Sequence, residues 1–154
     1  MVKLAVISDS HWGQVHLEMF LRAARAENFD AILHLGDGLS DARRLAKELT
    51  TEVRYVAGNC DPRFSCDREL RLTYGDVRIL MVHGDLYNVK YDNGPLSYYA
   101  EEAGAQVALF GHTHQPFAGY VGRVLMVNPG ALKDGRYAVL QIDRGQAVPF
   151  LKEL

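Results

Sequence analysis

Three things are scarce in this sequence: cysteine, long apolar runs and an excess of charge of one sign. Only Cys60 and Cys66 occur in 154 residues, which excludes a disulfide scaffold and favours reduced thiols. The longest stretch without Asp, Glu, Lys or Arg, residues 103–122, contains histidine, glutamine and proline, so no membrane span is expected. Lys plus Arg number 17 and Asp plus Glu 19, a balance that argues against a stable complex with nucleic acid.

The length and the first residues set the expected organisation. A chain of 154 residues fits one domain over residues 1–154. Only four apolar residues separate Lys3 from Ser8, fewer than the roughly 7–15 of a secretory signal. Together with the reduced cysteines, this indicates a cytoplasmic protein.

Short apolar runs and amphipathic stretches alternate through the first third of the chain. Strands are expected at residues 4–7, 31–35, 53–57, 77–82, 107–110, 124–127 and 137–142. Helices are expected at 15–27, at 40–49 with Ser40 as N-cap, and at 95–103. The order β-α-β-α-β followed mostly by strands predicts a layered α/β domain, in which the later strands form a second sheet or an extension.

Polar residues follow five of these strands at their carboxyl ends, the edge of an α/β sheet where binding sites form. Glycines in the same segments allow sharp turns and close approach to a ligand. Helix capping would explain Asp9 or Asp37 alone, and His34 is expected to be a hydrogen-bonded core residue. Five clusters together favour a site. The pooled side chains are Asp9, His11, Asp37, Asn59, His83, His112 and His114.

These seven side chains supply carboxylate, amide and imidazole groups but no thiolate. Such a set suits Mn²⁺, Fe or Zn²⁺ rather than a structural zinc held by cysteine thiolates. Seven ligands exceed the needs of one tetrahedral metal and fit two metals that share a carboxylate. Two divalent cations against two carboxylates leave positive charge, which favours an anionic substrate such as a phosphate ester. The set therefore predicts two-metal hydrolytic chemistry.

Five motifs in order resemble those of the calcineurin-like metallophosphoesterases: Asp9-x-His11, Gly36-Asp37, Gly58-Asn59-Cys60-Asp61, His83-Gly84 and Gly111-His112-Thr113-His114. The short length, Cys60 and the turn Asn128-Pro129-Gly130 resemble the small YfcE-like phosphodiesterase branch. The resemblance covers residues 1–143. It implies an α/β fold, a four-layer α/β/β/α sandwich with two mixed sheets, and a dinuclear centre between strand ends.

The resemblance also implies a role for each ligand. The first metal would be held by Asp9, His11 and His114, the second by Asn59, His83 and His112, and Asp37 would bridge both. Asp37, Asn59 and His112 would act in catalysis, in which a metal-activated water or hydroxide attacks phosphorus. We expect Mn²⁺ first, because hard oxygen and imidazole ligands accept it, while Fe, Ni²⁺ and Zn²⁺ remain open.

Cys60 departs from many relatives, which have a histidine there that protonates the leaving group. The YfcE-like branch shares the cysteine. A nucleophilic role for the thiol is disfavoured because the sequence places no convincing base for it. Leaving-group protonation is therefore expected to be weak, and aryl diesters to react faster than alkyl diesters.

Three residues near the ligands, Trp12, Cys60 and Asp61, are expected to contact the substrate. The substrate is expected to be a small phosphate ester, nucleotide-like if Trp12 stacks on a base; packing of Trp12 over the first helix is the alternative. Four tyrosines lie in residues 86–99 and indicate either a substrate lip or the interface of a homodimer or higher homo-oligomer.

The sequence thus predicts a metal-dependent phosphoesterase, and a phosphodiesterase before a phosphomonoesterase. The alternative from another class is a non-catalytic metal-binding scaffold, like the subunit of the retromer complex that is similar in fold. The complete ligand set favours the enzyme.

Overall fold

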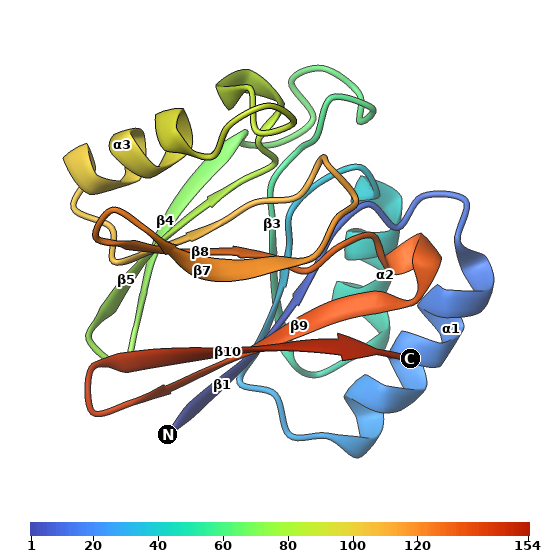
Figure 1. Cartoon of the computed structure of the whole chain (residues 1–154). Helices are drawn as coiled ribbons and strands as arrows, with labels where there is room; N and C mark the ends of the chain where they lie inside the picture. Colours follow the sequence, from blue (N-terminus) through green and yellow to red (C-terminus); the bar gives the residue numbers. More distant parts are fainter.

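The computed structural model describes all 154 residues, which form two five-stranded sheets (Figure 1). The first sheet has the order β10-β9-β1-β2-β3, and the second has the order β4-β5-β6-β8-β7. Strands β1, β2 and β3 run parallel, as do β5, β6 and β8, while the remaining neighbours are antiparallel. The strands are β1 (Val2–Ile7), β2 (Ala31–His34), β3 (Glu52–Tyr55), β4 (Glu69–Tyr74), β5 (Val77–Val82), β6 (Val107–Leu109), β7 (Phe117–Val121), β8 (Val124–Asn128), β9 (Arg136–Asp143) and β10 (Gln146–Glu153).

Helices cover the outer faces of both sheets, which confirms the predicted four-layer sandwich. Helices α1 (Gln14–Ala26) and α2 (Leu39–Glu48) lie on the first sheet, and α3 (Gly94–Glu102) lies on the second (Figure 1). Two short 3-10 turns, Asp85–Tyr87 and Leu132–Asp134, follow β5 and β8. None of the helices combines the length and apolar character needed to cross a membrane.

The alternation of side chains along the strands builds three apolar layers. Leu4 and Val6 of β1 point between the sheets, while Ala5 and Ile7 point toward α1. Strand β5 shows the same alternation toward the first sheet and toward α3. Both faces of the central strands are largely apolar, and the polar clusters follow the carboxyl ends of these strands. Within the strands, His34 at the end of β2 and Asn128 at the end of β8 are buried polar residues, and Arg78 of β5 is exposed.

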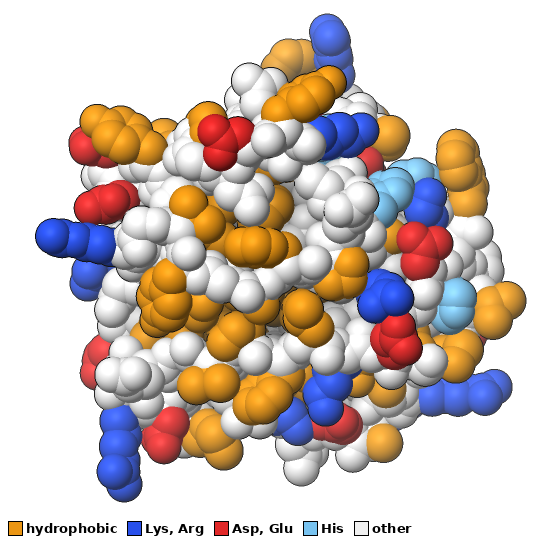
Figure 2. Space-filling view, in the orientation of Figure 1, with side chains coloured by type: hydrophobic (Ala, Val, Ile, Leu, Met, Phe, Trp, Pro, Cys, Tyr) orange, Lys and Arg blue, Asp and Glu red, His pale blue; other side chains and the backbone are white.

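Three strands escaped the sequence analysis: β4, β7 and β10. In β4 charged residues occupy alternate positions, and β7 contains Gly119. Strand β10 contains Pro149, which an edge strand tolerates because one side of its backbone needs no partner. Edge strands β7 and β10 contact each other, and Figure 2 shows apolar side chains gathered over this region.

The expected helix cap at Ser40 is wrong. Helix α2 begins at Leu39 after Gly38, and no side chain of its own N-terminus makes a capping hydrogen bond. The carboxylate of Asp61 instead accepts the backbone N–H groups of Gly38 and Leu39. A residue distant in sequence thus replaces the local cap.

Two of the four tyrosines in residues 86–99 pack together, and the other two are exposed. Tyr87 and Tyr99 pack on each other, with ring centroids 5.2 Å apart, and Tyr99 donates a hydrogen bond to Glu69. Tyr91 and Tyr98 are exposed. A homo-oligomer interface at this segment stays a prediction.

Candidate metal centre

The loops that carry the predicted ligands meet at one edge of the sandwich. The loops after β1 and β2 bring Asp9 and Asp37 from the first sheet. The loops after β5 and β6 bring His83 and His112 from the second, and these loops converge at the top of Figure 1. Histidine side chains reach the surface at the upper right of Figure 2. The centre therefore lies where the parallel strands of both sheets end.

Five side chains from four loops face one another at short range. His83 Nε2 lies 3.2 Å from Asp37 Oδ2 and 3.9 Å from Asp9 Oδ1. His114 Nε2 lies 3.2 Å from the same Asp9 oxygen. Asp37, His83 and His112 each place one possible ligand atom within 4.8 Å of the others. Oxygen and nitrogen donors from four separate loops thus share one small space.

Two buried atoms of this centre, Asp9 Oδ1 and His83 Nε2, have no hydrogen-bond partner. His83 Nδ1 lies 2.8 Å from the carbonyl oxygen of Leu35, which can only accept, so Nδ1 carries the proton of the neutral ring. Nε2 then presents a lone pair toward the two carboxylates. Buried acceptors without a donor are costly, and a divalent cation satisfies them. The residues present therefore fit the metal that the motifs imply.

The second oxygen of each carboxylate is held by the protein. Ser8 Oγ donates to Asp9 Oδ2 at 2.6 Å, and the backbone N–H of His112 donates to the same atom at 3.2 Å. The N–H of Cys60 donates to Asp37 Oδ1 at 2.8 Å. Each carboxylate is thus oriented through one oxygen, while the other faces the centre.

Charge at the centre shifts the pKa values of its members. Burial acts to raise the pKa of Asp37, but His83 and the Cys60 N–H outweigh it and hold that pKa well below its usual range. Burial acts to lower the pKa of His83, but the adjacent Asp37 and the charge of Asp9 raise it overall. Burial, and then the neighbouring His83, lower the pKa of His112. The Asp37 carboxylate is therefore ionised at neutral pH, and a bound cation would displace any proton from His83.

The backbone is strained where the ligands sit. Asp9, Asp37, His112 and His114 have φ values of 52°, 57°, 69° and 62°, in the left-handed region. Residues other than glycine rarely adopt this region, and such strain gathers at functional sites. At Gly36, with φ 103°, a Cβ atom would lie 2.6 Å from the nitrogen of Gly58. The loops after β2 and β3 therefore touch through backbone.

Asp61 ties these two loops together. Its Oδ2 accepts the N–H groups of Asp37 and Gly58, both at 2.8 Å. Its Oδ1 accepts those of Gly38 at 3.1 Å and Leu39 at 3.0 Å. The carboxylate thereby fixes the main chain of the bridging ligand candidate, a role that the sequence did not reveal. The predicted substrate contact of Asp61 stays a prediction.

A buried polar layer lies beneath the ligand loops. His34, expected to be a core histidine, is fully buried, and its Nδ1 accepts the N–H of Gly36 at 3.1 Å. Nε2 therefore carries the proton and donates to Ser10 Oγ at 2.8 Å. Ser10 donates in turn to Asp41 Oδ2 at 2.7 Å. Burial is the main cause that lowers the pKa of His34 to about 4, so the ring is neutral.

The remaining predicted residues surround the centre. His11 Nδ1 bonds the carbonyl oxygen of Asp37 at 2.7 Å, which leaves Nε2 available as a ligand atom. The Asn59 side chain is exposed, with its amide nitrogen 3.6 Å from Cys60 Sγ, and its place in the ligand set stays a prediction. Burial, and then the charge of Asp37, raise the pKa of the Cys60 thiol. Trp12 is 90% exposed, so it does not pack over α1.

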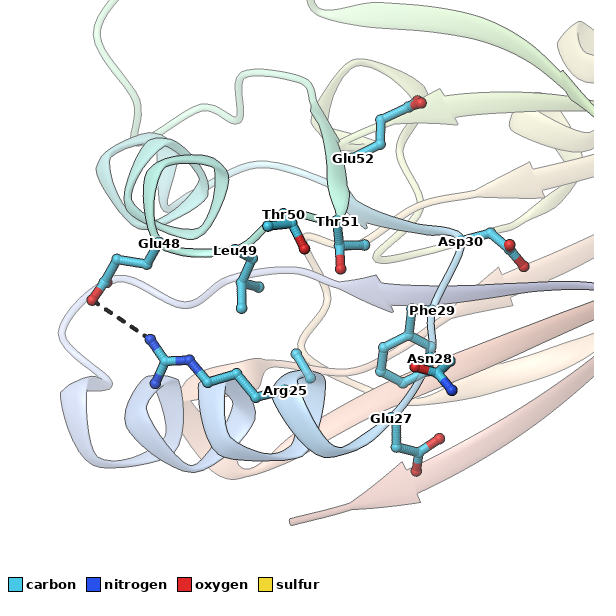
Figure 3. Close-up of a pocket in the computed structure, with 11 residues that line it drawn as sticks. Arg25, Glu27, Asn28, Phe29, Asp30, Glu48, Leu49, Thr50, Thr51 and Glu52 are labelled. Carbon is cyan, nitrogen blue, oxygen red and sulfur yellow. Dashed lines mark ion pairs between the residues drawn. The ribbon is translucent and has the colours of Figure 1, made fainter.

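A hollow of about 580 Å³ lies away from this centre and has a different character. Figure 3 shows its lining at the C-terminal end of α1 and at the segments that precede β2 and β3. Glu27, Asp30, Glu48 and Glu52 give it an acidic rim, and Arg25 pairs with Glu48 at 4.0 Å. No histidine lines it, and volume alone does not make it the reaction site.

Comparisons with known proteins find relatives over almost the whole chain. The family model of the calcineurin-like phosphoesterase superfamily domain matches residues 2–145. The probable metallophosphoesterase YsnB of Bacillus subtilis is 34% identical over 152 residues, which cover 95% of this chain and 88% of YsnB.

Two solved structures show the same fold at lower identity. An archaeal phosphodiesterase has a TM-score of 0.79 at 18% identity and covers 98% of this chain and 100% of its own. A mutant of Vps29 from Entamoeba histolytica has a TM-score of 0.80 at 19% identity, with 99% of both chains covered. At these identities the likeness concerns the fold alone.

We expect Asp61→Asn to lower the free energy of unfolding by about 1–3 kcal/mol, because an amide cannot accept all four N–H groups. Urea denaturation of the chelator-stripped protein measures this change. Asp67→Asn is the matched control, since Asp67 is exposed and its carboxylate makes no hydrogen bond. Equal stability of the two variants would contradict the bracing role.

We expect the His34 ring to stay neutral until the pH falls to about 4. An unfolded chain takes up this proton near its ordinary value of 6.5, so the folded state loses stability as the pH falls from about 6.5 toward 4. Ring ¹H–¹³C shifts in a pH titration of the chelator-stripped protein follow the ring directly. Protonation of His34 near pH 6.5 would contradict the claim that burial keeps the ring neutral.

Proposed function

Because the chain belongs to the calcineurin-like phosphoesterase superfamily, we propose that it is a phosphodiesterase that uses two divalent metals, with Mn²⁺ the first to try. One metal would be held by Asp9, His11 and His114, and the other by Asn59, His83 and His112, with Asp37 between them. The observation that carries this proposal is the buried, unpartnered pair Asp9 Oδ1 and His83 Nε2.

Bound metals would supply Lewis-acid activation of water and neutralise charge on the phosphate in the transition state. The chain itself supplies orientation. Asp37 is held by the Cys60 N–H, and Asp9 by Ser8 and the His112 N–H, so the two carboxylates keep fixed directions. His83 is held by the Leu35 carbonyl in the tautomer that exposes Nε2. These contacts prepare the site before substrate binds.

The chain offers no strong acid for the leaving group at the position of Cys60. Its thiol pKa is raised above an already high value by burial and by Asp37, so it transfers a proton poorly at neutral pH. Esters whose leaving group departs without protonation would therefore be favoured. This supports a preference for diesters with stable leaving groups.

We expect chelator-stripped protein to hydrolyse bis-p-nitrophenyl phosphate only when Mn²⁺ is added back. Asp37→Ala should lower the rate at least a hundredfold, because it removes the shared ligand. Release of p-nitrophenolate measures the rate, and Asp67→Ala serves as a distant control. Absence of turnover with Mn²⁺, Ni²⁺, Fe²⁺ and Zn²⁺ would favour a non-catalytic metal-binding scaffold. Faster hydrolysis of p-nitrophenyl phosphate than of the diester would instead favour a phosphomonoesterase.

We expect methyl p-nitrophenyl phosphate to react much faster at its aryl bond than dimethyl phosphate reacts at either alkyl bond. The expected ratio of the two rates is at least about a thousandfold, since no good general acid assists the departure of an alkoxide. Phosphorus NMR follows both substrates. Comparable rates would contradict this account, because they would show that some group in the site protonates an alkoxide leaving group efficiently.

A further inference from the structure

Trp12 is held in an unusual way beside the predicted metal ligand His11. Its φ of 62° is in the left-handed region, which is an outlier for a bulky side chain. Its side chain is 90% exposed, and its ring meets the His11 ring edge-on with centroids 4.8 Å apart. Burial of the indole therefore does not compensate for the strain. Strain of this kind persists at binding and catalytic sites.

A cleft of about 400 Å³ opens at Trp12, and we name it the Trp12 cleft. The turn that carries His11 and Trp12 forms part of the lining, and Pro62 comes from the loop that follows β3. The start of α2 forms another part of the lining. The complete lining is His11, Trp12, Gly38, Leu39, Ser40, Arg43, Cys60, Asp61 and Pro62. Because His11 belongs both to this cleft and to the predicted ligand set, a group bound here would lie next to a phosphate at the metals.

Arg43 is a lining residue of this cleft whose charge has no ion-pair partner. It is exposed, forms no ion pair with a carboxylate, and makes one long hydrogen bond of 3.5 Å, to the carbonyl oxygen of Ser65. The next residue, Arg44, is paired with both Glu18 and Glu48. Asp61 also lines the cleft, but both of its oxygens already accept backbone N–H groups. Arg43 is therefore available for an anion from solution.

We propose that the Trp12 cleft binds the nucleoside end of the substrate, with the base stacked on Trp12 and a phosphate other than the scissile one held by Arg43. The substrate class is then a nucleotide diester that carries at least one further phosphate. The assignment rests on the proposed phosphodiesterase function for the position of the scissile phosphate. Aromatic rings stack on any base face, and an arginine fork matches a phosphate, so the two groups together select base plus phosphate rather than either alone.

The sequence itself provides the probe, because Trp12 is the single tryptophan of the chain. Indole fluorescence of the chelator-stripped protein, excited where tyrosine does not absorb, is titrated with ADP, adenosine and pyrophosphate. We expect saturable quenching by ADP at submillimolar concentration, weaker binding of adenosine, and no quenching by pyrophosphate. Arg43→Ala should raise the Kd for ADP about tenfold, the effect of one charge-assisted contact.

Arg22→Ala is the matched control, since Arg22 is an exposed arginine of α1 without an ion pair and lies outside the cleft. It should leave the Kd unchanged. Absence of saturable quenching at millimolar ADP, or equal Kd values for Arg43→Ala and Arg22→Ala, would overturn the assignment.

The failure of this inference is separable from failure of the proposed function. Metal-dependent hydrolysis of bis-p-nitrophenyl phosphate without quenching by ADP would reject the nucleotide cleft and keep the phosphodiesterase. Quenching by ADP that depends on Arg43, without hydrolysis by any metal form, would keep the binding site and reject the phosphodiesterase.

Discussion

Two acceptor atoms buried face to face, one from each sheet, are the constraint on which the site depends. Asp9 Oδ1 follows β1 and His83 Nε2 follows β5, and neither has a hydrogen-bond partner. In the neutral ring, the Leu35 carbonyl holds the proton of His83 on Nδ1, so Nε2 and Asp9 Oδ1 cannot satisfy each other. Burying such a pair is unfavourable unless a cation lies between the sheets. The metal would therefore be part of what joins the two halves of the sandwich at this edge.

Much of the surrounding structure holds the main chain of the ligand loops in unfavourable conformations. The carboxylate of Asp61 gathers four N–H groups from the loops after β2 and β3. Below them, the neutral ring of His34 links Gly36 to Ser10, and Ser10 links to Asp41. These contacts are buried or partly buried, where hydrogen bonds are stronger than in water. They therefore help to offset the backbone strain at Asp9 and Asp37. Rigid supports of this kind keep ligand atoms in place when no cation is bound.

The sequence was most informative where polar residues directly follow an apolar, buried strand, because such residues have few roles other than forming a site. Apolar side chains dominate both faces of β1, β2, β5 and β6, so Asp9, Asp37, His83 and His112 beyond their ends could be predicted to share a site, and the structure brings them together. The fold followed from the same apolar runs and from the motifs.

Other features depend on tertiary contacts that no local pattern contains. The cap of α2 comes from Asp61, more than twenty residues beyond Leu39, so Ser40 was the natural but incorrect choice. Strand β10 carries a proline that only its edge position permits. The exposure of Trp12 and the free state of Arg43 could not be predicted either, because both depend on which side chains fold back against them.

The most direct test of this account is anomalous diffraction from crystals grown with Mn²⁺, with data collected on both sides of the manganese absorption edge. The account predicts two peaks, one on each side of the Asp37 carboxylate, with Asp9 and His83 among their ligands. A single peak at this edge of the sandwich, or none while Mn²⁺ is bound elsewhere, would contradict a dinuclear centre built from these loops.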